Sequence, residues 1–271
     1  MILDDILTKK RKDLEELKVR LPLARLQKIA ESRTTFIRRN FKQALQNTKK
    51  INIIAELKKA SPSEGLLRED FQPMRLAEIY EISGASAISI LTEPHYFMGR
   101  SSYLKTVRQV TSIPLLRKDF IFERYQIYET AILEADAFLL ISSLLSEEEL
   151  RDFIVLGKSL GMDALVEVHS DEDLHKALAA GGEIIGINNR NLRTLEVNPR
   201  NAERLIPHIP AGKVIVVESG LKTHDEILSY KSIGTHAFLI GRTFMKSPDI
   251  AQTFHQLLGK HNATLIEGTH G

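Results

Sequence analysis

From residue 53 onward, short apolar runs alternate with longer amphipathic stretches. The runs are rich in leucine and β-branched residues, which is typical of strands buried on both faces of a parallel sheet. We predict eight strands, at Ile53–Lys58, Ala87–Leu91, Pro114–Lys118, Ala137–Ile141, Ala164–Val168, Glu183–Asn188, Lys213–Glu218 and Ala237–Ile240. Eight strand–helix units are the number that closes a (β/α)8 barrel, so we predict an α/β TIM-barrel fold.

The stretches between these runs have helical periodicity. We predict helices at Met74–Ile82, Glu123–Glu134, Ser146–Leu160, Ser170–Ala180, Thr223–Ile233 and Ser247–Gly259. Ser146 precedes a helical pattern and Glu149 follows three residues later, which is the spacing of a capping box. Four of the helical patterns end at a glycine (Gly84, Gly161, Gly181 and Gly234), the residue that most often follows a helix C-terminus.

The chain is predicted to be one domain with three parts: an N-terminal helical extension (1–50), the barrel (51–260) and a polar tail (261–271). The extension begins with an amphipathic pattern formed by Ile2, Ile6, Leu7, Leu14 and Leu17, which ends before Pro22. Fifty residues are too few for a second core. We therefore expect helices that pack on the barrel and reach over its mouth.

Polar side chains stand at the ends of the predicted strands. They are Glu56, Lys58, Lys118, Glu167, Asn188 and Glu218. A barrel gathers the C-terminal ends of its strands at one mouth, and strand residues two apart share a face. Buried charges are costly unless they are paired or bind a ligand. We predict that these residues form an active site; the alternative is a lattice of ion pairs, Glu56–Lys58 and Lys118–Glu167, that only holds the rim together.

Two glycine turns follow the last two strands. Ser219 and Gly220 end the seventh unit, and Gly241 and Arg242 end the eighth. Backbone N–H groups can approach an anion at such turns, and this is the usual phosphate position of the fold. We predict a phosphate site here, to which Lys58 and Arg190 can add positive charge.

Apolar side chains near several strand ends could form a wall for a planar ring. They are Phe97, Phe120, Leu139, Leu192 and Leu239. Ordinary core packing explains each of them equally well when it is considered alone.

Composition removes several classes of function. The 37 basic and 35 acidic residues nearly cancel, so no overall field favours nucleic acid. Cysteine is absent, the nine histidines show no metal-ligand spacing, and no GxGxxG motif occurs. The charged N-terminus is unlike a signal peptide, and no apolar run approaches the ~18 residues of a membrane span. We expect a cytoplasmic protein without metal or cofactor.

Six segments, in this order and at these intervals, resemble one family: IIAELKKASPSEG, LRKDFI, LVEVHS, IGINNRNL, VESG and FLIG. This is the indole-3-glycerol phosphate synthase family of tryptophan biosynthesis, and the resemblance runs from Ile2 to about Leu258. It implies a (β/α)8 barrel with a helical N-terminal extension. It also implies ring closure of 1-(2-carboxyphenylamino)-1-deoxyribulose 5-phosphate with loss of carbon dioxide and water, without a cofactor.

The resemblance also implies roles for individual residues. Lys118 matches the general acid and Glu167 the general base. Further catalytic groups are Glu56, Lys58, Asn188 and Glu218; substrate contacts are Ser61, Ser63 and Arg190; and Ser219, Gly220, Gly241 and Arg242 surround the phosphate. The chain departs from the usual family pattern at Asn191, Val217 and Arg242, and the Arg242 guanidinium could touch the phosphate directly.

Other functions remain open from the residues alone. A sister barrel such as phosphoribosylanthranilate isomerase, or an aldolase with a Schiff-base lysine, shares the architecture. A catalytically silent phosphate-sugar binder is a third possibility, although it would need neither Lys118 nor Glu167. The expected partner is a small phosphorylated substrate, with no nucleic acid or membrane partner, and we expect a monomer.

Overall fold

Eight parallel strands are hydrogen-bonded into a closed ring in the computed structural model, which describes residues 2–32, 36–191 and 194–260. The strands are β1 (Asn52–Leu57), β4 (Ala87–Leu91), β5 (Leu115–Lys118), β6 (Ala137–Ile141), β7 (Asp163–Val168), β8 (Ile184–Asn188), β9 (Val214–Glu218) and β10 (Ala237–Ile240). Each strand pairs with its neighbours in chain order, and β10 pairs with β1 to close the ring. The predicted barrel is confirmed. All eight strands begin and end within one residue of the predicted bounds.

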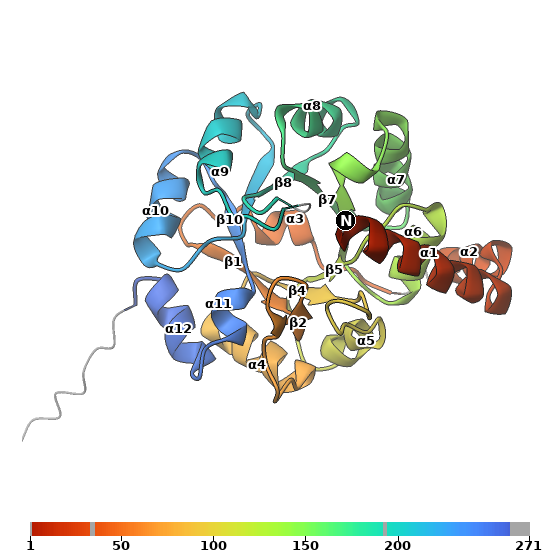
Figure 1. Ribbon diagram of the computed structural model, residues 1–271, viewed down its shortest axis with the longest axis horizontal. Coiled ribbons are helices and arrows are strands. Elements are labelled where there is room, and N and C mark those ends of the chain that lie inside the picture. Colours follow the sequence, from red (N-terminus) through yellow and green to blue (C-terminus); the bar gives the residue numbers. More distant parts are fainter. Residues whose placement is uncertain (1, 33–35, 192–193, 261–271) are drawn as a thin grey trace, which may run out of the picture.

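Helices surround the ring of strands (Figure 1). They are α4 (Pro73–Ser83), α5 (Ser102–Arg108), α6 (Arg124–Ile132), α7 (Glu147–Ser159), α8 (Asp171–Ala179), α9 (Arg200–Leu205), α10 (His224–Ser232), α11 (Arg242–Met245) and α12 (Ile250–Leu257), with 3-10 turns at Ser142–Leu144 and Ile206–His208. The Ser146 hydroxyl accepts from the Glu149 N–H at 3.2 Å, and the Glu149 carboxylate accepts from the Ser146 N–H at 2.8 Å, so the capping box is confirmed.

Three of these helices are absent from the sequence prediction. α5, α9 and α11 contain only seven, six and four residues, which is too short for a clear 3.6-residue period. The predicted helix at Ser247–Gly259 is shorter, Ile250–Leu257, and α11 precedes it. The loop after β1 also forms an unpredicted antiparallel hairpin of β2 (Ala60–Ser61) and β3 (Gly65–Leu66).

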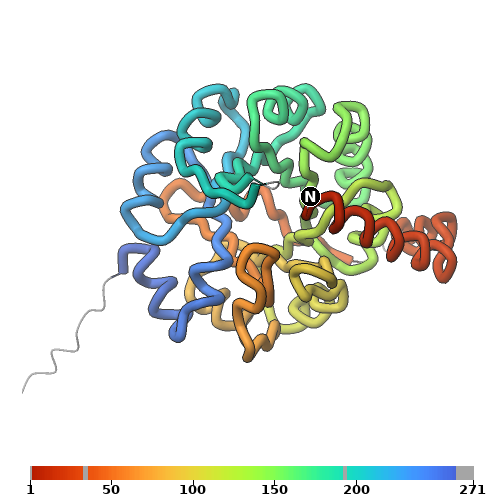
Figure 2. Tube along the Cα trace, viewed as in Figure 1, coloured from red at the N-terminus to blue at the C-terminus, as the bar shows by residue number. Residues whose placement is uncertain are grey.

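The N-terminal segment forms α1 (Ile2–Arg20), α2 (Leu23–Glu31) and α3 (Phe41–Ala44). The start of α1 lies over the centre of the ring, and α2 extends to the side, where it packs on α6 (Figure 2). Lys10 of α1 forms a 2.7 Å ion pair with the buried Asp119, just beyond β5. This pair fixes α1 to the mouth of the barrel.

The other end of the barrel is closed by α3. Phe41 and Leu45 are fully buried and pack in one apolar cluster with Ile184, Val214 and Ala237, which lie at the N-terminal ends of their strands. The N-terminal end of the barrel is therefore closed by α3, and the cavity lies at the opposite end, beside the start of α1. Within the ranges described, no helix is both long enough and apolar enough to cross a membrane. Leu192 and the predicted tail (261–271) lie outside the described residues.

Candidate active site

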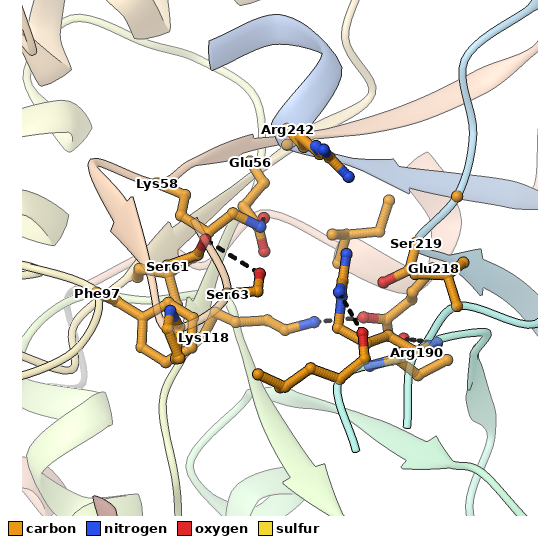
Figure 3. Close-up of a pocket in the computed structure, with 18 of the residues that line it drawn as sticks. Glu56, Lys58, Ser61, Ser63, Phe97, Lys118, Arg190, Glu218, Ser219 and Arg242 are labelled. Atoms are coloured by element: carbon orange, nitrogen blue, oxygen red, sulfur yellow. Dashed lines mark hydrogen bonds and ion pairs between the residues drawn. The ribbon is translucent and has the colours of Figure 1, made fainter. Parts of the chain in front are cut away.

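A cavity of about 620 Å³ opens at the C-terminal ends of the strands. Every predicted site residue that the structure describes lines it: Glu56, Lys58, Ser61, Ser63, Phe97, Lys118, Phe120, Leu139, Glu167, Asn188, Arg190, Glu218, Ser219, Gly220, Leu239, Gly241 and Arg242. Figure 3 shows charged groups from opposite walls that point toward one another across this space. Residues spread over nearly two hundred positions of sequence thus meet in one site.

Lys118, at the end of β5, extends into the cavity between two carboxylates. Its ammonium group contacts Glu218 Oε2 directly and lies 3.4 Å from Glu167 Oε2. Burial alone would lower the pKa of Lys118, but the carboxylates of Glu218 and Glu167 outweigh it and raise that pKa well above its usual value. Lys118 is therefore held in its charged form.

Glu218, at the end of β9, is 1% exposed. Burial and the nearby charge of Glu167 raise the pKa of Glu218 to about 7, although Lys118 opposes the shift. Of its two carboxylate oxygens, Oε2 contacts Lys118, while Oε1 accepts no hydrogen bond from the part of the chain that the structure describes.

Glu56 and Lys58 form a second acid–base pair on β1 and just beyond it. They share a strand face and their charged groups are in direct contact. Burial works to raise the pKa of Glu56, but the ammonium groups of Lys58 and Lys118 bring it below its usual value. Glu56 therefore stays ionised and holds Lys58 at the rim.

Glu167 is oriented from the neighbouring strand β8. Its Oε1 accepts a 3.0 Å hydrogen bond from the Asn188 side-chain amide, while Asn188 Oδ1 accepts from the Arg190 N–H at 2.9 Å. His169 is not among the residues that line the cavity, and its Nδ1 lies 2.9 Å from the backbone oxygen of Asn188. These contacts aim the free edge of the Glu167 carboxylate at Lys118.

The two glycine turns lie together on one side of the cavity. Ser219 and Gly220 both have left-handed backbones, with φ of 68° and 82°. A non-glycine residue in this region is strained, and such strain is common at functional sites. Arg190 is nearby and half-buried; burial and the positive charge of Arg242 lower its pKa. The positive charges of Arg190 and Arg242 favour an anionic ligand on this side of the cavity.

Arg242 is paired with another part of the chain. Its guanidinium contacts Glu64 in the β2–β3 hairpin, and Lys246 lies 3.2 Å from the same carboxylate. The sequence interpretation assigned Arg242 to the phosphate alone and did not identify Glu64. The hairpin, with Ser61 and Ser63, is thereby fixed to α11, which follows the neighbouring strand β10.

An apolar wall faces the charged groups. The rings of Phe97 and Phe120 lie 6.2 Å apart, and Leu139 and Leu239 are buried beside the cavity. The structure adds side chains from the start of α1 that the sequence analysis did not assign to the site: Ile2, Leu3 and Ile6. The extension was expected to reach over the mouth, but the sequence did not indicate which of its side chains would line the cavity.

A buried polar network is centred on Asp119, the residue that follows Lys118. Asp119 accepts hydrogen bonds from Lys10 at 2.7 Å, Thr92 at 2.6 Å and Arg117 at 2.9 Å. Although burial opposes it, the charges of Lys10 and Arg117 lower the pKa of Asp119 to about 2. The sequence analysis missed Asp119, even though it directly follows Lys118. Among the residues with described positions, no cluster of three or more metal-ligating side chains exists.

Comparison with known sequences gives one consistent family. A sequence model of indole-3-glycerol phosphate synthase matches residues 3–257. The indole-3-glycerol phosphate synthase of Campylobacter jejuni (strain RM1221) is 46% identical over 258 residues, which cover 95% of this chain and all of that protein. Those of Carboxydothermus hydrogenoformans and Acetivibrio thermocellus are 45% and 44% identical, covering 95% and 94% of this chain and 100% and 98% of theirs.

Solved structures agree on the architecture. A crystal structure of KGPDC from Streptococcus mutans has a TM-score of 0.60 at 14% identity, covering 78% of this chain and 97% of that one. A mandelate oxidase structure has a TM-score of 0.58 at 12% identity, covering 81% and 83%. At such low sequence identity, the structural similarity shows the fold alone. The family is shown by the near-complete sequence match, and the strand-end residues assembled in the cavity agree with it. This chain belongs to the indole-3-glycerol phosphate synthases.

Proposed function

We propose that this chain converts 1-(2-carboxyphenylamino)-1-deoxyribulose 5-phosphate to indole-3-glycerol phosphate by general acid–base catalysis. The observation that carries the proposal is the position of Lys118, a charged amine between Glu167 and Glu218 in a cavity with glycine turns on one side and an apolar wall on another. Each part of this substrate has a chemical counterpart in that cavity.

The substrate is expected to lie across the mouth. Its phosphate would be bound by the backbone N–H groups of the turns at Gly220 and Gly241, with Arg190 supplying positive charge. Its aromatic ring would pack against Phe97 and Phe120. This places the ketone of the sugar near the centre of the cavity, where the Lys118 ammonium lies.

Ring closure is the first chemical step. The aromatic carbon that bears the carboxylate attacks the ketone carbon, and the ketone oxygen takes a proton from Lys118. The oxygen that develops is an alkoxide, a far stronger base than an amine, so even a tightly held ammonium proton is transferred to it. Carbon dioxide then leaves from the attacking carbon, and its bonding electrons restore the aromatic ring.

Dehydration completes the indole. The hydroxyl leaves as water with a proton from Lys58 or Lys118. Glu167 removes a proton from the adjacent ring carbon, which was C1 of the sugar, so that the second double bond of the indole ring forms and the ring nitrogen keeps its hydrogen. Groups of this kind typically contribute ~10²–10⁴-fold each. Glu56, Asn188 and Glu218 would orient the reacting side chains and the sugar hydroxyls.

The direct test uses the synthetic substrate and follows the fluorescence of the indole product. We expect product and carbon dioxide in equal amounts. Binding without turnover would instead identify a silent phosphate-sugar binder. Formation of the substrate from phosphoribosylanthranilate, with no indole product, would identify the sister isomerase.

We also propose that the protein acts as a monomer in the cytoplasm. One chain supplies the whole described lining of the cavity, so catalysis requires no residue from a second copy. Biosynthesis of an amino acid from phosphorylated intermediates and the absence of cysteine from the sequence fit a reducing cytoplasm. Sedimentation at working concentration tests the monomer.

The turn at Gly220 should set substrate affinity. Gly220→Ala places a side chain on a backbone with φ of 82°, and its Cβ would lie 2.9 Å from Val197 Cγ1. The turn must shift away from the phosphate, so we expect KM to rise roughly 10-fold or more while kcat changes less. Inorganic phosphate should inhibit the parent protein competitively and the variant more weakly.

Gly212→Ala is the matched control. Gly212 has a similar φ of 88°, but it precedes β9 at the closed end of the barrel and no atom lies within 4 Å of its Cβ position. It carries the same backbone strain without reaching the cavity. Equal effects of the two substitutions on KM, or no inhibition by phosphate at high millimolar concentration, would place the phosphate elsewhere.

The start of α1 should contribute to substrate binding. Replacing both Leu3 and Ile6 by alanine removes apolar surface from the cavity wall, so we expect KM to rise about 10-fold with the fold intact. Val19→Ala, on the same helix and 82% exposed, is the control and should change neither KM nor the melting temperature. An unchanged KM in the double variant would show that α1 does not touch bound substrate.

A further inference from the structure

Gly186 occupies an unusual place in the barrel interior. It lies within β8, paired with Glu167 on one side and Val216 on the other. Glycine weakens a strand, so its presence often marks a close approach of other atoms. Gly186 is not among the glycines with positive φ, so the backbone conformation does not require glycine here. The reason for a glycine at this position must therefore be the space that a side chain would occupy.

The side chain of Glu218 fills that space. A Cβ atom on Gly186 would lie 2.5 Å from Glu218 Oε1, and 3.2 Å from Leu165 Cδ1. Glu218 therefore reaches from β9 across β8 to contact Lys118 from β5. No described hydrogen bond holds the oxygen above Gly186, so the path of this side chain depends on the open space and on its ion pair with Lys118.

We propose that Gly186 is a positioning residue for the reaction: its missing side chain leaves the space that seats the Glu218 carboxylate against Lys118. This inference rests on the proposed function, in which Lys118 donates the proton. An alanine would push the carboxylate away from the ammonium group. Lys118 would then lose its nearest negative charge and its fixed position over the cavity.

A second glycine in the same cavity makes room for the other pair. A Cβ atom on Gly241 would collide with the Glu56 carboxylate, whose carbon lies 2.9 Å from the Cβ position. The φ of Gly241 is −122°, which any residue adopts. Lys118 and Lys58 are thus each paired with a carboxylate that lies against a glycine. Besides approaching the phosphate, Gly241 makes room for the partner of Lys58.

The first test is Gly186→Ala in the full-length protein. We expect kcat to fall about 10- to 100-fold, because a shift of about 1 Å in a catalytic group has effects of this size, while KM changes by less than about threefold. The pKa of Lys118 should fall when its partner moves away, so the basic limb of the kcat–pH profile should move to lower pH. A purely structural role would not move that limb.

Gly157→Ala is the matched control. A Cβ atom there would collide with the Phe138 ring between α7 and β6, outside the cavity. It should lower the melting temperature but leave kcat and the pH limb unchanged. A shifted pH limb in this variant, or a parent-like kcat in Gly186→Ala, would overturn the proposal.

The decisive comparison adds Glu218→Ala. With the carboxylate gone, Gly186→Ala should cost less than about threefold in kcat, and any loss of melting temperature that this substitution causes in the parent should largely disappear. The melting temperatures test the position of the Glu218 carboxylate above Gly186 even if the parent protein does not turn over the substrate. Lack of turnover would refute the proposed function separately. Equal losses with and without Glu218, or a double variant that also fails to fold, would assign the cost to Leu165 and overturn the proposal.

Discussion

Lys118→Met is expected to abolish measurable formation of the indole product. Methionine has a similar length but no proton to donate, so the ketone oxygen cannot be protonated as the ring closes. We expect kcat to fall by at least ~10⁴-fold, at the upper end of the usual contribution of a general acid. Substrate binding should survive in weakened form, because the phosphate turns and the apolar wall remain.

The same substitution leaves Glu167 and Glu218 without their shared cation. Removing one partner of a buried pair is destabilising, so thermal unfolding must be measured beside the kinetics. Lys105→Met, on the exposed face of α5, is the control and should change neither quantity. Turnover within tenfold of the parent by a folded Lys118→Met protein would remove Lys118 from the mechanism.

Glu167→Gln is expected to lower kcat by roughly 10²–10⁴-fold with little change in KM. The amide keeps the shape of the side chain and can still accept the hydrogen bond from Asn188, which is 3.0 Å long in the parent. It cannot remove the proton from the ring carbon beside the nitrogen, which dehydration requires. The loss should therefore appear in the chemical step and not in binding.

Glu172→Gln, on the exposed face of α8, provides the comparison for this prediction. It removes the same charge outside the cavity and should behave as the parent does. A Glu167→Gln protein that keeps more than half of the parent turnover would show that another group is the base.

The strands were predictable because strands that are buried on both faces consist of nearly continuous apolar residues. Runs such as Ala87–Leu91 and Ala137–Ile141 are almost wholly apolar and have the same bounds in prediction and structure. The short helix α11 and the β2–β3 hairpin have no comparable sequence pattern. Four helical residues span barely one turn, and a two-residue strand shows no alternation.

The members of the site were predictable, and so were two of its ion pairs, Glu56–Lys58 and Lys118–Glu167, but a third was not. Strand parity placed Lys118, Glu167 and Glu218 at one mouth. It did not indicate that Lys118 would also be in direct contact with Glu218. That contact depends on the room above Gly186 and on side-chain torsions, which no periodicity encodes.

Contacts between distant segments were also beyond prediction. Lys10 and Asp119 are 109 residues apart, and their ion pair exists only because α1 folds back over the barrel mouth. The Arg242–Glu64 pair likewise depends on where the hairpin lies. Only the packed structure distinguishes the buried Lys10 from its exposed neighbours.

The central claim is that Lys118 acts as a charged proton donor and not as an imine-forming nucleophile. An imine requires a neutral amine, and the carboxylates beside Lys118 raise its pKa and keep it protonated. The most direct measurement adds borohydride to the parent protein during turnover and determines the intact mass of the protein. We predict an unmodified mass with continued formation of the indole product; a reduced substrate adduct that maps to Lys118 would contradict the claim.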